Sequence, residues 1–478
     1  MKKRTHNRII SALISCVMLA SFTLALPAGA FFEYSQNDLT NYRLEHYNPD
    51  DGWVGMTKWD GEPPIITEYI YNDELGEAVL KQIFYTCKPD EKPNDLVIPD
   101  TIEGYRVTSI FPTAFQWTGF ETVTVPEGVR DIGDWGFGRC SNLHSIILPE
   151  SLEKIGAYAF WHDDSLTEVV IPDNVGEIGE GAFEYCYALT DLTLPESLTE
   201  IPDNLCRAAV SLVNVNIPDG VKSIGDNAFA ACHELAEINI PDGVETIGDF
   251  AFNCCDVVTK IEIPDSVTEI GMDAFRSCLS ATQVELSKSL ETVAPYAFAD
   301  CPNLEAVIIP EGVKSIEHHA FNVTPEDYHF DVGNIVNVEG GKIFALYLPS
   351  TIESIGEYAF TCQGPMTIYY GGTEEEWANV EIADYNDEVL NATVIFLGGD
   401  NGDDPGTGVE EPAEKIAGDV NGDGKVNAKD LTRFLKYLAG NNVEVVEEAL
   451  DMNCDGKINS KDLIRLLKYM AGDETTTD

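Results

Sequence analysis

Residues 222–229 read KSIGDNAF, residues 245–252 read ETIGDFAF, and residues 153–160 read EKIGAYAF. A proline recurs at the same step of 23 residues: Pro126, Pro149, Pro172, Pro195, Pro218, Pro241, Pro264 and Pro310. Between Pro264 and Pro310 the position is held by Ser287. A phenylalanine keeps this step from Phe137 to Phe321, interrupted only by Cys206. A fixed period of this length predicts a solenoid, because one repeat cannot bury its apolar face alone whereas stacked coils share a core.

Each repeat can be translated into one coil. Residues 166–171 carry apolar side chains at alternating positions near their end, which predicts a short strand. A proline turn follows, after which Val175 and Ile178 are expected to point back into the core. We expect Gly179 to permit a sharp bend and residues 182–183 to fill the far side of the coil. Ten or so coils, spaced about 4.8 Å apart, predict a rod of roughly 50 Å.

The repeat resembles the BspA-like (type 5) leucine-rich repeats of bacterial surface and secreted proteins. The resemblance rests on the recurring motif I-P-x-x-V-x-x-I-G-x-x-A-F-x-x-C-x-x-L-x-x-I-x-I-P and covers residues 97–397. It implies a mostly β repeat solenoid of leucine-rich repeat coils. Residues 31–96 are expected to form an irregular N-terminal cap. An insertion near 324–342 interrupts the register, and residues 353–397 are expected to close the rod.

The repeat register places two sets of potentially reactive side chains in columns along the rod, here called ladders. Each ladder could bind a ligand or could serve a purely structural role. The first consists of Cys140, Cys186, Cys232, Cys255, Cys278 and Cys301. Stacked thiols could form disulfides or bind a soft metal, but Asp163 and Ala209 take the same position elsewhere, which favours a buried packing residue. The second consists of Asp173, Glu196, Asp219, Asp242, Asp265 and Glu311. These acids could bind cations, but solvated turn residues are favoured.

Two rows of side chains are expected on the exposed side of the strands, where leucine-rich repeats generally meet partners. Their middle section is rich in amides and carboxylates, which suits sugar hydroxyls or a basic protein patch. We predict a repeat binding face formed by Asp191, Thr193, Asn214, Asn216, Glu237, Asn239, Lys260 and Glu262. The rows continue to Gln283 and Ala306, and only Ile147 and Val170 make a small apolar spot.

The chain of 478 residues has Lys+Arg 29 against Asp+Glu 82, a formal net charge of −53. This charge repels nucleic-acid phosphate and anionic membranes, so neither is expected as a partner. The first 30 residues differ: a basic start precedes an apolar run that ends in small residues at 28–30. The pattern predicts a signal peptide over residues 1–30 and a secreted, extracellular protein without a membrane span. A membrane anchor and a lipoprotein box at Cys16 are less favoured, because Pro27 and the small residues suit cleavage and few apolar residues precede Cys16.

The C-terminal part contains a duplication that predicts calcium binding. After an acidic Gly/Pro linker over residues 398–415, residues 419–430 read DVNGDGKVNAKD and residues 451–462 read DMNCDGKINSKD. Oxygen ligands at loop positions 1, 3, 5, 9 and 12, with Gly424 and Gly456 at position 6, are what a calcium loop requires. We therefore predict two Ca²⁺ ions, with the lysines contributing backbone carbonyls. The ligands would be Asp419, Asn421, Asp423, Lys425, Asn427 and Asp430, and Asp451, Asn453, Asp455, Lys457, Asn459 and Asp462.

Each loop is followed by a helical pattern, there is no room for a helix before the first loop, and position 12 is Asp rather than Glu. Two such half EF-hands over residues 416–473, with a tail at 474–478, resemble a type I dockerin, a small all-α module. The resemblance implies binding to a cohesin module of a scaffoldin protein in a cellulosome-type complex that degrades plant polysaccharides. It places contacts at Ala428, Lys429, Leu435, Lys436, Ser460, Lys461, Leu467 and Lys468. The duplicated basic triplets add Arg433 and Arg465 to this surface and predict an acidic cohesin face, with two possible binding orientations.

These features predict a secreted, non-catalytic binding subunit that a dockerin attaches to a cohesin, with repeats that bind a glycan or a protein. A glycoside hydrolase-associated enzyme of polysaccharide catabolism is the first alternative, because most dockerin-bearing proteins resemble such enzymes. The sequence contains neither a Gly-x-Ser-x-Gly elbow nor a His-Glu-x-x-His helix, and His318 and His319 are interpreted as surface variation. An adhesin or a protein inhibitor is the second alternative.

Overall fold

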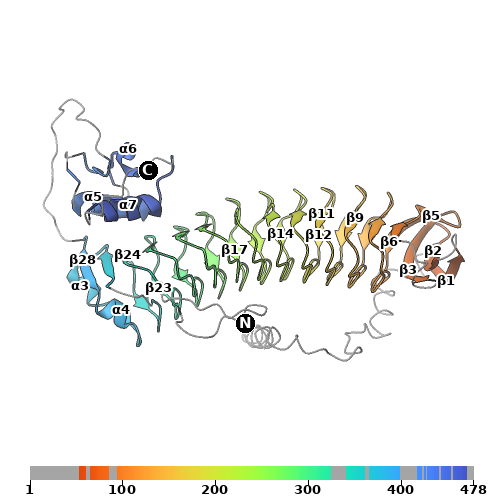
Figure 1. Ribbon diagram of the computed structural model, residues 1–478, viewed down its shortest axis with the longest axis horizontal. Coiled ribbons are helices and arrows are strands. Elements are labelled where there is room, and N and C mark those ends of the chain that lie inside the picture. The colour runs from red at the N-terminus through yellow and green to blue at the C-terminus, as the bar shows by residue number, and fades with distance from the viewer. Residues whose placement is uncertain are drawn as a thin grey trace.

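The computed structural model describes residues 53–60, 65–85, 94–323, 341–360, 365–398, 417–422, 425–426, 428–440, 443–453 and 456–470. The described chain forms an elongated β-solenoid of about 12 turns, and a small helical module lies beside its last coils (Figure 1). The predicted repeat fold is confirmed. The predicted signal peptide, nearly all of the linker and the C-terminal tail fall outside the described residues.

Most coils contribute one short strand to each of two faces of the rod. The long-strand face consists of β4 (Asp95–Val97), β7 (Thr122–Thr124), β9 (Ser145–Ile147), β11 (Glu168–Val170), β13 (Asp191–Thr193), β15 (Asn214–Val215), β18 (Lys260–Glu262), β20 (Gln283–Glu285), β22 (Ala306–Ile308), β24 (Ala345–Leu348), β26 (Thr367–Tyr370) and β28 (Thr393–Phe396). The short-strand face consists of β6 (Tyr105–Ile110), β8 (Asp131–Ile132), β10 (Lys154–Ile155), β12 (Glu177–Ile178), β14 (Glu200–Ile201), β16 (Ser223–Ile224), β17 (Thr246–Ile247), β19 (Glu269–Ile270), β21 (Thr292–Val293), β23 (Ser315–Ile316), β25 (Ser354–Ile355) and β27 (Glu381–Ile382). Neighbouring strands are parallel and pair residues 23 apart, such as Glu168 with Asp191.

The described part of the N-terminal cap is regular rather than irregular, so that expectation is wrong there. Strands β1 (Trp53–Asp60), β2 (Ile65–Asn72) and β3 (Glu77–Tyr85) form an antiparallel meander, and β3 continues into the short-strand face by parallel pairing with β6. The strand β5 (Thr101–Ile102) pairs antiparallel with β6 on the edge opposite β3, because Arg106 pairs with both Glu77 and Thr101. The turn between β2 and β3 explains the regularity: the Asn72 carboxamide oxygen accepts from two turn amides, and Gly76 has a φ of 65°.

The interior of the rod is a ladder of stacked phenylalanines. The ring centroids of Phe137 and Phe160 lie 5.5 Å apart, and those of Phe160 and Phe183 lie 5.1 Å apart. Val175 and Ile178 are buried beside this ladder, as predicted. Stacked pairs of this kind add about 0.5–1.5 kcal/mol each to the burial of their surface. They tie neighbouring coils together on both sides of Cys206, where the ladder is interrupted.

Gly179 is required for a reason that differs from the predicted bend. Its φ lies outside the left-handed region, but a Cβ added there would lie only 2.3 Å from the backbone nitrogen of Ala157 in the preceding coil. The left-handed residue is instead Gly181, with a φ of 61°. A glycine at position 179 therefore allows close approach of adjacent coils.

The ladder cysteines are buried and their thiols are free, which confirms the packing interpretation. The Sγ atoms of Cys140 and Cys186 each donate to a phenylalanine carbonyl oxygen at 3.1 Å. Burial raises the pKa of both thiols well above the ordinary value. These thiols are therefore protonated packing groups.

Pairing continues across the insertion, whose residues 324–340 are not described. Strand β22 pairs with β24 over a separation of 39 residues, which is 16 more than the repeat of 23, and Phe321 still stacks on Phe360 at 5.2 Å. The closing unit adds the short helices α3 (Glu374–Trp377) and α4 (Asp387–Leu390), and Thr373 forms a capping box with Glu376. Within the described residues, no helix has the length and apolar character needed to cross a membrane.

Candidate calcium and partner-binding surfaces

The C-terminal module contains α5 (Ala428–Leu438), α6 (Glu447–Leu450) and α7 (Ser460–Met470). The last predicted ligand of each loop lies in the first turn of α5 or α7 and is buried. The Asp430 Oδ1 atom accepts from the Asn421 amide at 3.0 Å, and the Asp462 Oδ1 atom accepts from the Asn453 amide at 3.1 Å. In both units a buried carboxylate therefore ties the start of the helix to loop position 3.

The described loop residues fit a divalent cation. Asp419 and Asn459 are buried, the Asp451 Oδ2 atom accepts from the Gly456 amide at 2.9 Å, and Gly456 has the left-handed φ of 82° that a sharp turn at position 6 needs. Asn421, Asp451 and Asn453 are half-buried, whereas the side chains of Lys425 and Lys457 are exposed. Asp423, Gly424, Asn427 and Asp455 lie outside the described residues. A cluster of three His, Cys, Asp or Glu side chains suited to a metal is absent from the part of the chain that is described.

The predicted repeat binding face is exposed or half-exposed along the long-strand face. Its polar groups bond to one another: the Asn214 Nδ2 atom donates to Asp191 at 2.7 Å, and Asn216 bonds to both backbone groups of Leu194. Lys260 forms an ion pair with Glu262. A ligand at this face would have to replace these internal bonds.

Comparison with family models assigns the rod and the C-terminal module each to a known family. The BspA type leucine rich repeat region matches residues 108–236 and 199–326 in six copies, and the dockerin type I domain matches residues 417–471. The chain combines BspA-type leucine-rich repeats with a type I dockerin domain. No curated protein is a significant match.

Several crystal structures of bacterial leucine-rich repeat proteins are similar to the rod. A leucine rich cell surface protein from Faecalibacterium prausnitzii is 24% identical, with a TM-score of 0.39, and the match covers 69% of this chain and 98% of that one. The leucine rich repeat protein of T. pallidum is 26% identical, with a TM-score of 0.36, over 47% and 91% of the two chains. The pneumococcal vaccine antigen PcpA is 18% identical, with a TM-score of 0.42, over 72% and 98%.

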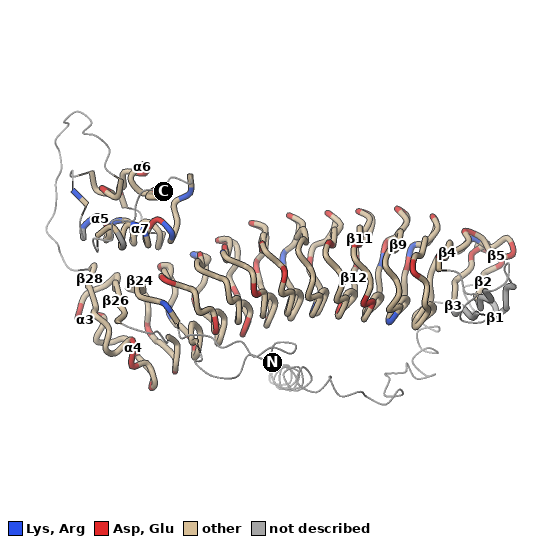
Figure 2. Tube along the Cα trace, viewed as in Figure 1, with Lys and Arg blue, Asp and Glu red and all other residues tan. Residues whose placement is uncertain are grey.

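The predicted cohesin contacts of the dockerin differ in exposure. Lys429 and Lys461 are exposed, and both α5 and α7 carry basic residues (Figure 2). Leu435 and Ser460 are buried, whereas the half-buried residues are Arg433, Lys436, Arg465 and Leu467. The side chains of Ala428 and Lys468 are not described.

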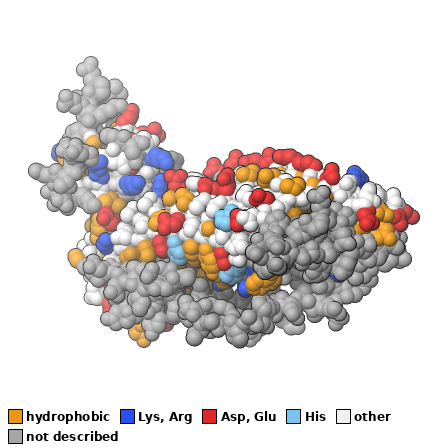
Figure 3. Space-filling view, turned by 45° about the vertical axis from the view of Figure 1, so that its right-hand side comes forward, with side chains coloured by type: hydrophobic (Ala, Val, Ile, Leu, Met, Phe, Trp, Pro, Cys, Tyr) orange, Lys and Arg blue, Asp and Glu red, His pale blue; other side chains and the backbone are white. Residues whose placement is uncertain are grey.

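The rod, by contrast, presents many acidic side chains along one edge (Figure 3). The acids that follow the repeat prolines lie mostly at exposed turns, as expected for solvated turn residues.

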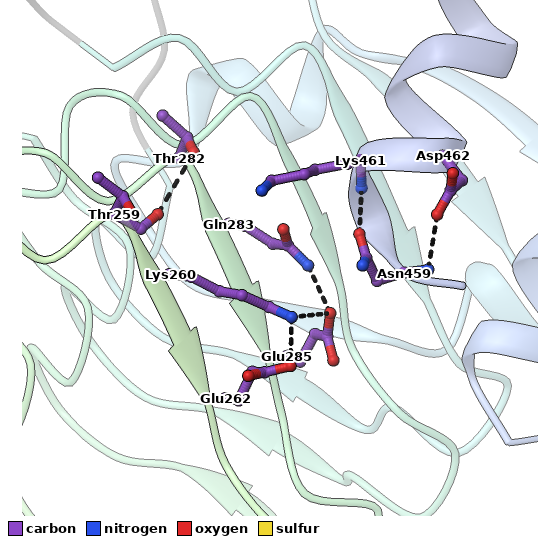
Figure 4. Close-up of polar contacts among 9 residues, drawn as sticks. All are labelled: Thr259, Lys260, Glu262, Thr282, Gln283, Glu285, Asn459, Lys461 and Asp462. Atoms are coloured by element: carbon purple, nitrogen blue, oxygen red, sulfur yellow. Dashed lines mark hydrogen bonds and ion pairs between the residues drawn. The ribbon is translucent and has the colours of Figure 1, made fainter. Parts of the chain in front are cut away.

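The dockerin packs on the last coils of the long-strand face, which sequence reasoning did not foresee. The Lys436 Nζ atom donates to the Leu397 carbonyl oxygen at 3.1 Å, and Lys461 points from α7 toward Gln283 on β20 (Figure 4). Gln283 and Ala306, expected on an exposed row, are buried because α7 contacts β20 and β22. An apolar cluster joins the two parts: Ala306, Ala345, Tyr347, Tyr369 and Leu397 of the rod with Phe434, Leu435, Leu463 and Leu466 of the dockerin, among others.

His318 is exposed and His319 is half-buried at a repeat turn, as the interpretation of a surface variation expects, and His319 also takes part in a column of stacked rings. Its ring stacks between Tyr296 and Tyr358, at centroid distances of 4.6 and 4.9 Å. It belongs to a column formed by the third residue after the inward isoleucine or valine of each short strand. A signal for this column exists in the sequence, since the same repeat position holds Trp135, Tyr158, Phe250, Tyr296, His319, Tyr358 and Tyr385.

Proposed function

We propose that the protein is a secreted, non-catalytic binding subunit of a cellulosome-like complex. Its dockerin attaches it to a cohesin in a calcium-dependent manner, and its repeats hold a glycan or a protein partner. The duplicated loop–helix unit carries this proposal, because both position-12 carboxylates, Asp430 and Asp462, are buried at equivalent places in the two halves.

The loop residues organise the two helices for binding. Asp430 and Asp462 anchor the first turns of α5 and α7 to their loops through backbone amides. When bound, Ca²⁺ supplies the positive charge that offsets the repulsion among the clustered carboxylates. With the loops held, the helices carry the exposed Lys429 and Lys461 at corresponding positions of the two units, Lys461 on the side that faces the rod. Cations on an otherwise acidic molecule favour an acidic partner and make association sensitive to salt.

Calorimetric titration of the mature chain, residues 31–478, with a panel of type I cohesin modules tests attachment. We expect binding to at least one cohesin in millimolar Ca²⁺ and none after chelation with EDTA. A reducing-sugar assay on plant polysaccharides should show no hydrolysis above a buffer control. Failure of every cohesin to bind would refute attachment, and release of reducing sugar would refute the non-catalytic role.

A further inference from the structure

The N-terminal coils of the rod carry large aromatic side chains at turn positions whose backbone conformation does not require an aromatic residue. The third residue after the short-strand isoleucine is left-handed, with a φ of 58° at Trp135 and 56° at Tyr158. Asn204 and Asn227 adopt the same conformation in other coils, and asparagine tolerates it better than an aromatic residue does. The turn geometry therefore does not account for the aromatic rings.

These rings form a continuous cluster across neighbouring coils, on the turn side of the rod rather than on either strand face. Trp135 stacks on Tyr158 and meets the edge of Trp161, each at 4.8 Å between centroids. His162 stacks on Tyr185 at 4.7 Å in the next coil. Successive members are thus held at about the 4.8 Å spacing of the coils, so the cluster is a preformed surface.

The outer members of the cluster are accessible. Trp117 is 53% exposed and Tyr187 is 37% exposed, although large aromatic side chains are usually buried. The Arg139 guanidinium carbon lies 4.7 Å from the centroid of Trp117 and 4.4 Å from that of Trp161, which holds the two indoles on one surface.

Hydrogen-bonding groups surround the rings. Glu184 accepts from the Trp161 Nε1 atom at 3.2 Å and from Arg207 at 3.0 Å, and His162 pairs with Asp164 at 3.2 Å. Desolvation raises the pKa of Glu184 to about 7, and Arg207 opposes that rise. Flat rings bordered by carboxylate, guanidinium and imidazole groups can contact the C–H face of a sugar ring while bonding to its hydroxyls.

We propose that this cluster, the aromatic platform, binds a neutral polysaccharide chain that runs along the rod. The platform is defined by Trp117, Trp135, Tyr158, Trp161, Tyr185 and Tyr187. This inference rests on the proposed function and names its substrate-holding surface, which lies away from the predicted repeat binding face. A linear polymer suits it because the aromatic residues recur from coil to coil along the rod axis.

Charge favours a neutral glycan over an anionic polymer. Stacked aromatic residues with arginines could also hold single-stranded nucleic acid. However, the carboxylates of Glu180, Glu184 and Asp164 adjoin the rings, and the whole chain carries a net charge of −53. Phosphate or uronate groups would meet repulsion there, whereas uncharged hydroxyls can bond to the carboxylates.

Affinity electrophoresis of the mature chain tests the platform. Native gels would contain xylan, mixed-linkage β-glucan or mannan, with polygalacturonate as the anionic comparison. We expect at least one neutral polysaccharide to retard the wild type and polygalacturonate to have no effect. The double variant Trp117→Ala/Tyr187→Ala should raise the dissociation constant at least tenfold, because it removes the accessible rings without opening the buried core.

Two controls make the result specific. Tyr385→Ala removes a ring that is also exposed and stacked, but at the far end of the rod, and should bind as the wild type does. Asn239→Ala, on the repeat binding face, should also leave retardation unchanged. Absence of retardation by every neutral polysaccharide, unaltered binding by the double variant, or loss of binding in Asn239→Ala alone would overturn the proposal. Cohesin binding measured on the same samples keeps a failure of attachment distinct from a failure of the platform.

Discussion

At the scale of single residues, Asp163 shows how tightly the repeat constrains its interior. It occupies the cysteine position of the ladder, is 0% exposed and accepts from the Cys140 amide at 2.7 Å through Oδ1, while Oδ2 has no hydrogen-bond partner. Desolvation raises its pKa well above the ordinary value. The folded chain therefore holds a proton here that the unfolded chain releases near pH 4.

The substitution Asp163→Cys should stabilise the rod, and its advantage should grow with pH. Because the folded-state pKa of Asp163 is raised, ionisation favours the unfolded chain, and the free energy of unfolding falls as pH increases above about 4. Cysteine removes this proton linkage and suits the position, as Cys140 and Cys186 show on either side. Urea unfolding followed by circular dichroism at pH 5, 6, 7 and 8 should show a difference that widens by at most about 1.4 kcal/mol per pH unit. A constant difference would contradict the account, and Asp219→Asn, at an exposed turn, is the matched control.

At the scale of elements, the loop–helix units of the dockerin are similar but not equivalently placed. The two helices meet the rod through different residues: Lys436 near the end of α5 donates to the Leu397 carbonyl oxygen, whereas Lys461 at the start of α7 points toward Gln283 on β20. Their basic side chains nevertheless repeat along the two helices. Near-identical halves predict two cohesin orientations related by a half-turn.

Paired substitutions test the two orientations. The variants Lys429→Ala/Arg433→Ala and Lys461→Ala/Arg465→Ala should each retain cohesin binding, with a loss of less than about tenfold, because the intact helix can take over the contact. The combination of all four should lose binding, since neither helix then offers the charges on which association depends. Calorimetry against one cohesin measures this, and loss of binding in either double variant alone would exclude two orientations.

The features that follow from the repeat period were predictable, whereas the details of packing and the parts outside the repeats were not. The step of 23 predicted paired strands, the inward Val175 and the phenylalanine ladder, because each needs only local alternation and stacking. The role of Gly179 in close approach and the stacking of His319 arise from contacts between neighbouring coils, and the regular strands of the cap lie outside the 23-residue repeat. The duplicated loop–helix units were predictable from residue type and spacing, whereas the contact of Ser460 and Leu435 with their surroundings depends on three-dimensional packing.

At the scale of the whole molecule, the dockerin packs against the rod that it is proposed to attach to a cohesin. Half-buried Lys436 and buried Ser460 belong to the predicted cohesin surface. Ala306, on the outer side of β22, is buried in the apolar cluster that joins the two parts. A cohesin that binds the same residues must displace the rod from the dockerin. Its apparent dissociation constant is therefore the intrinsic constant divided by the fraction of molecules in which the dockerin is not in contact with the rod.

Weakening this contact should strengthen cohesin binding. The substitution Ala306→Glu places a carboxylate against the apolar cluster without altering the dockerin, and we expect the dissociation constant for a cohesin to fall by about threefold to tenfold. Thr193→Glu introduces the same charge at an exposed site on the long-strand face and should leave the affinity unchanged. Equal affinities of the wild type and Ala306→Glu would show that docking on the rod and cohesin binding do not compete.

The most direct measurement is calorimetric titration of Ca²⁺ into the chelator-treated mature chain. The account predicts two ions per chain in the wild type and one ion in either Asp430→Ala or Asp462→Ala, because each substitution removes the carboxylate that completes one loop. Removal of both should abolish uptake. Absence of a heat of Ca²⁺ binding in the wild type, or undiminished uptake in the double variant, would contradict the assignment of the loops and the calcium-dependent attachment built on it.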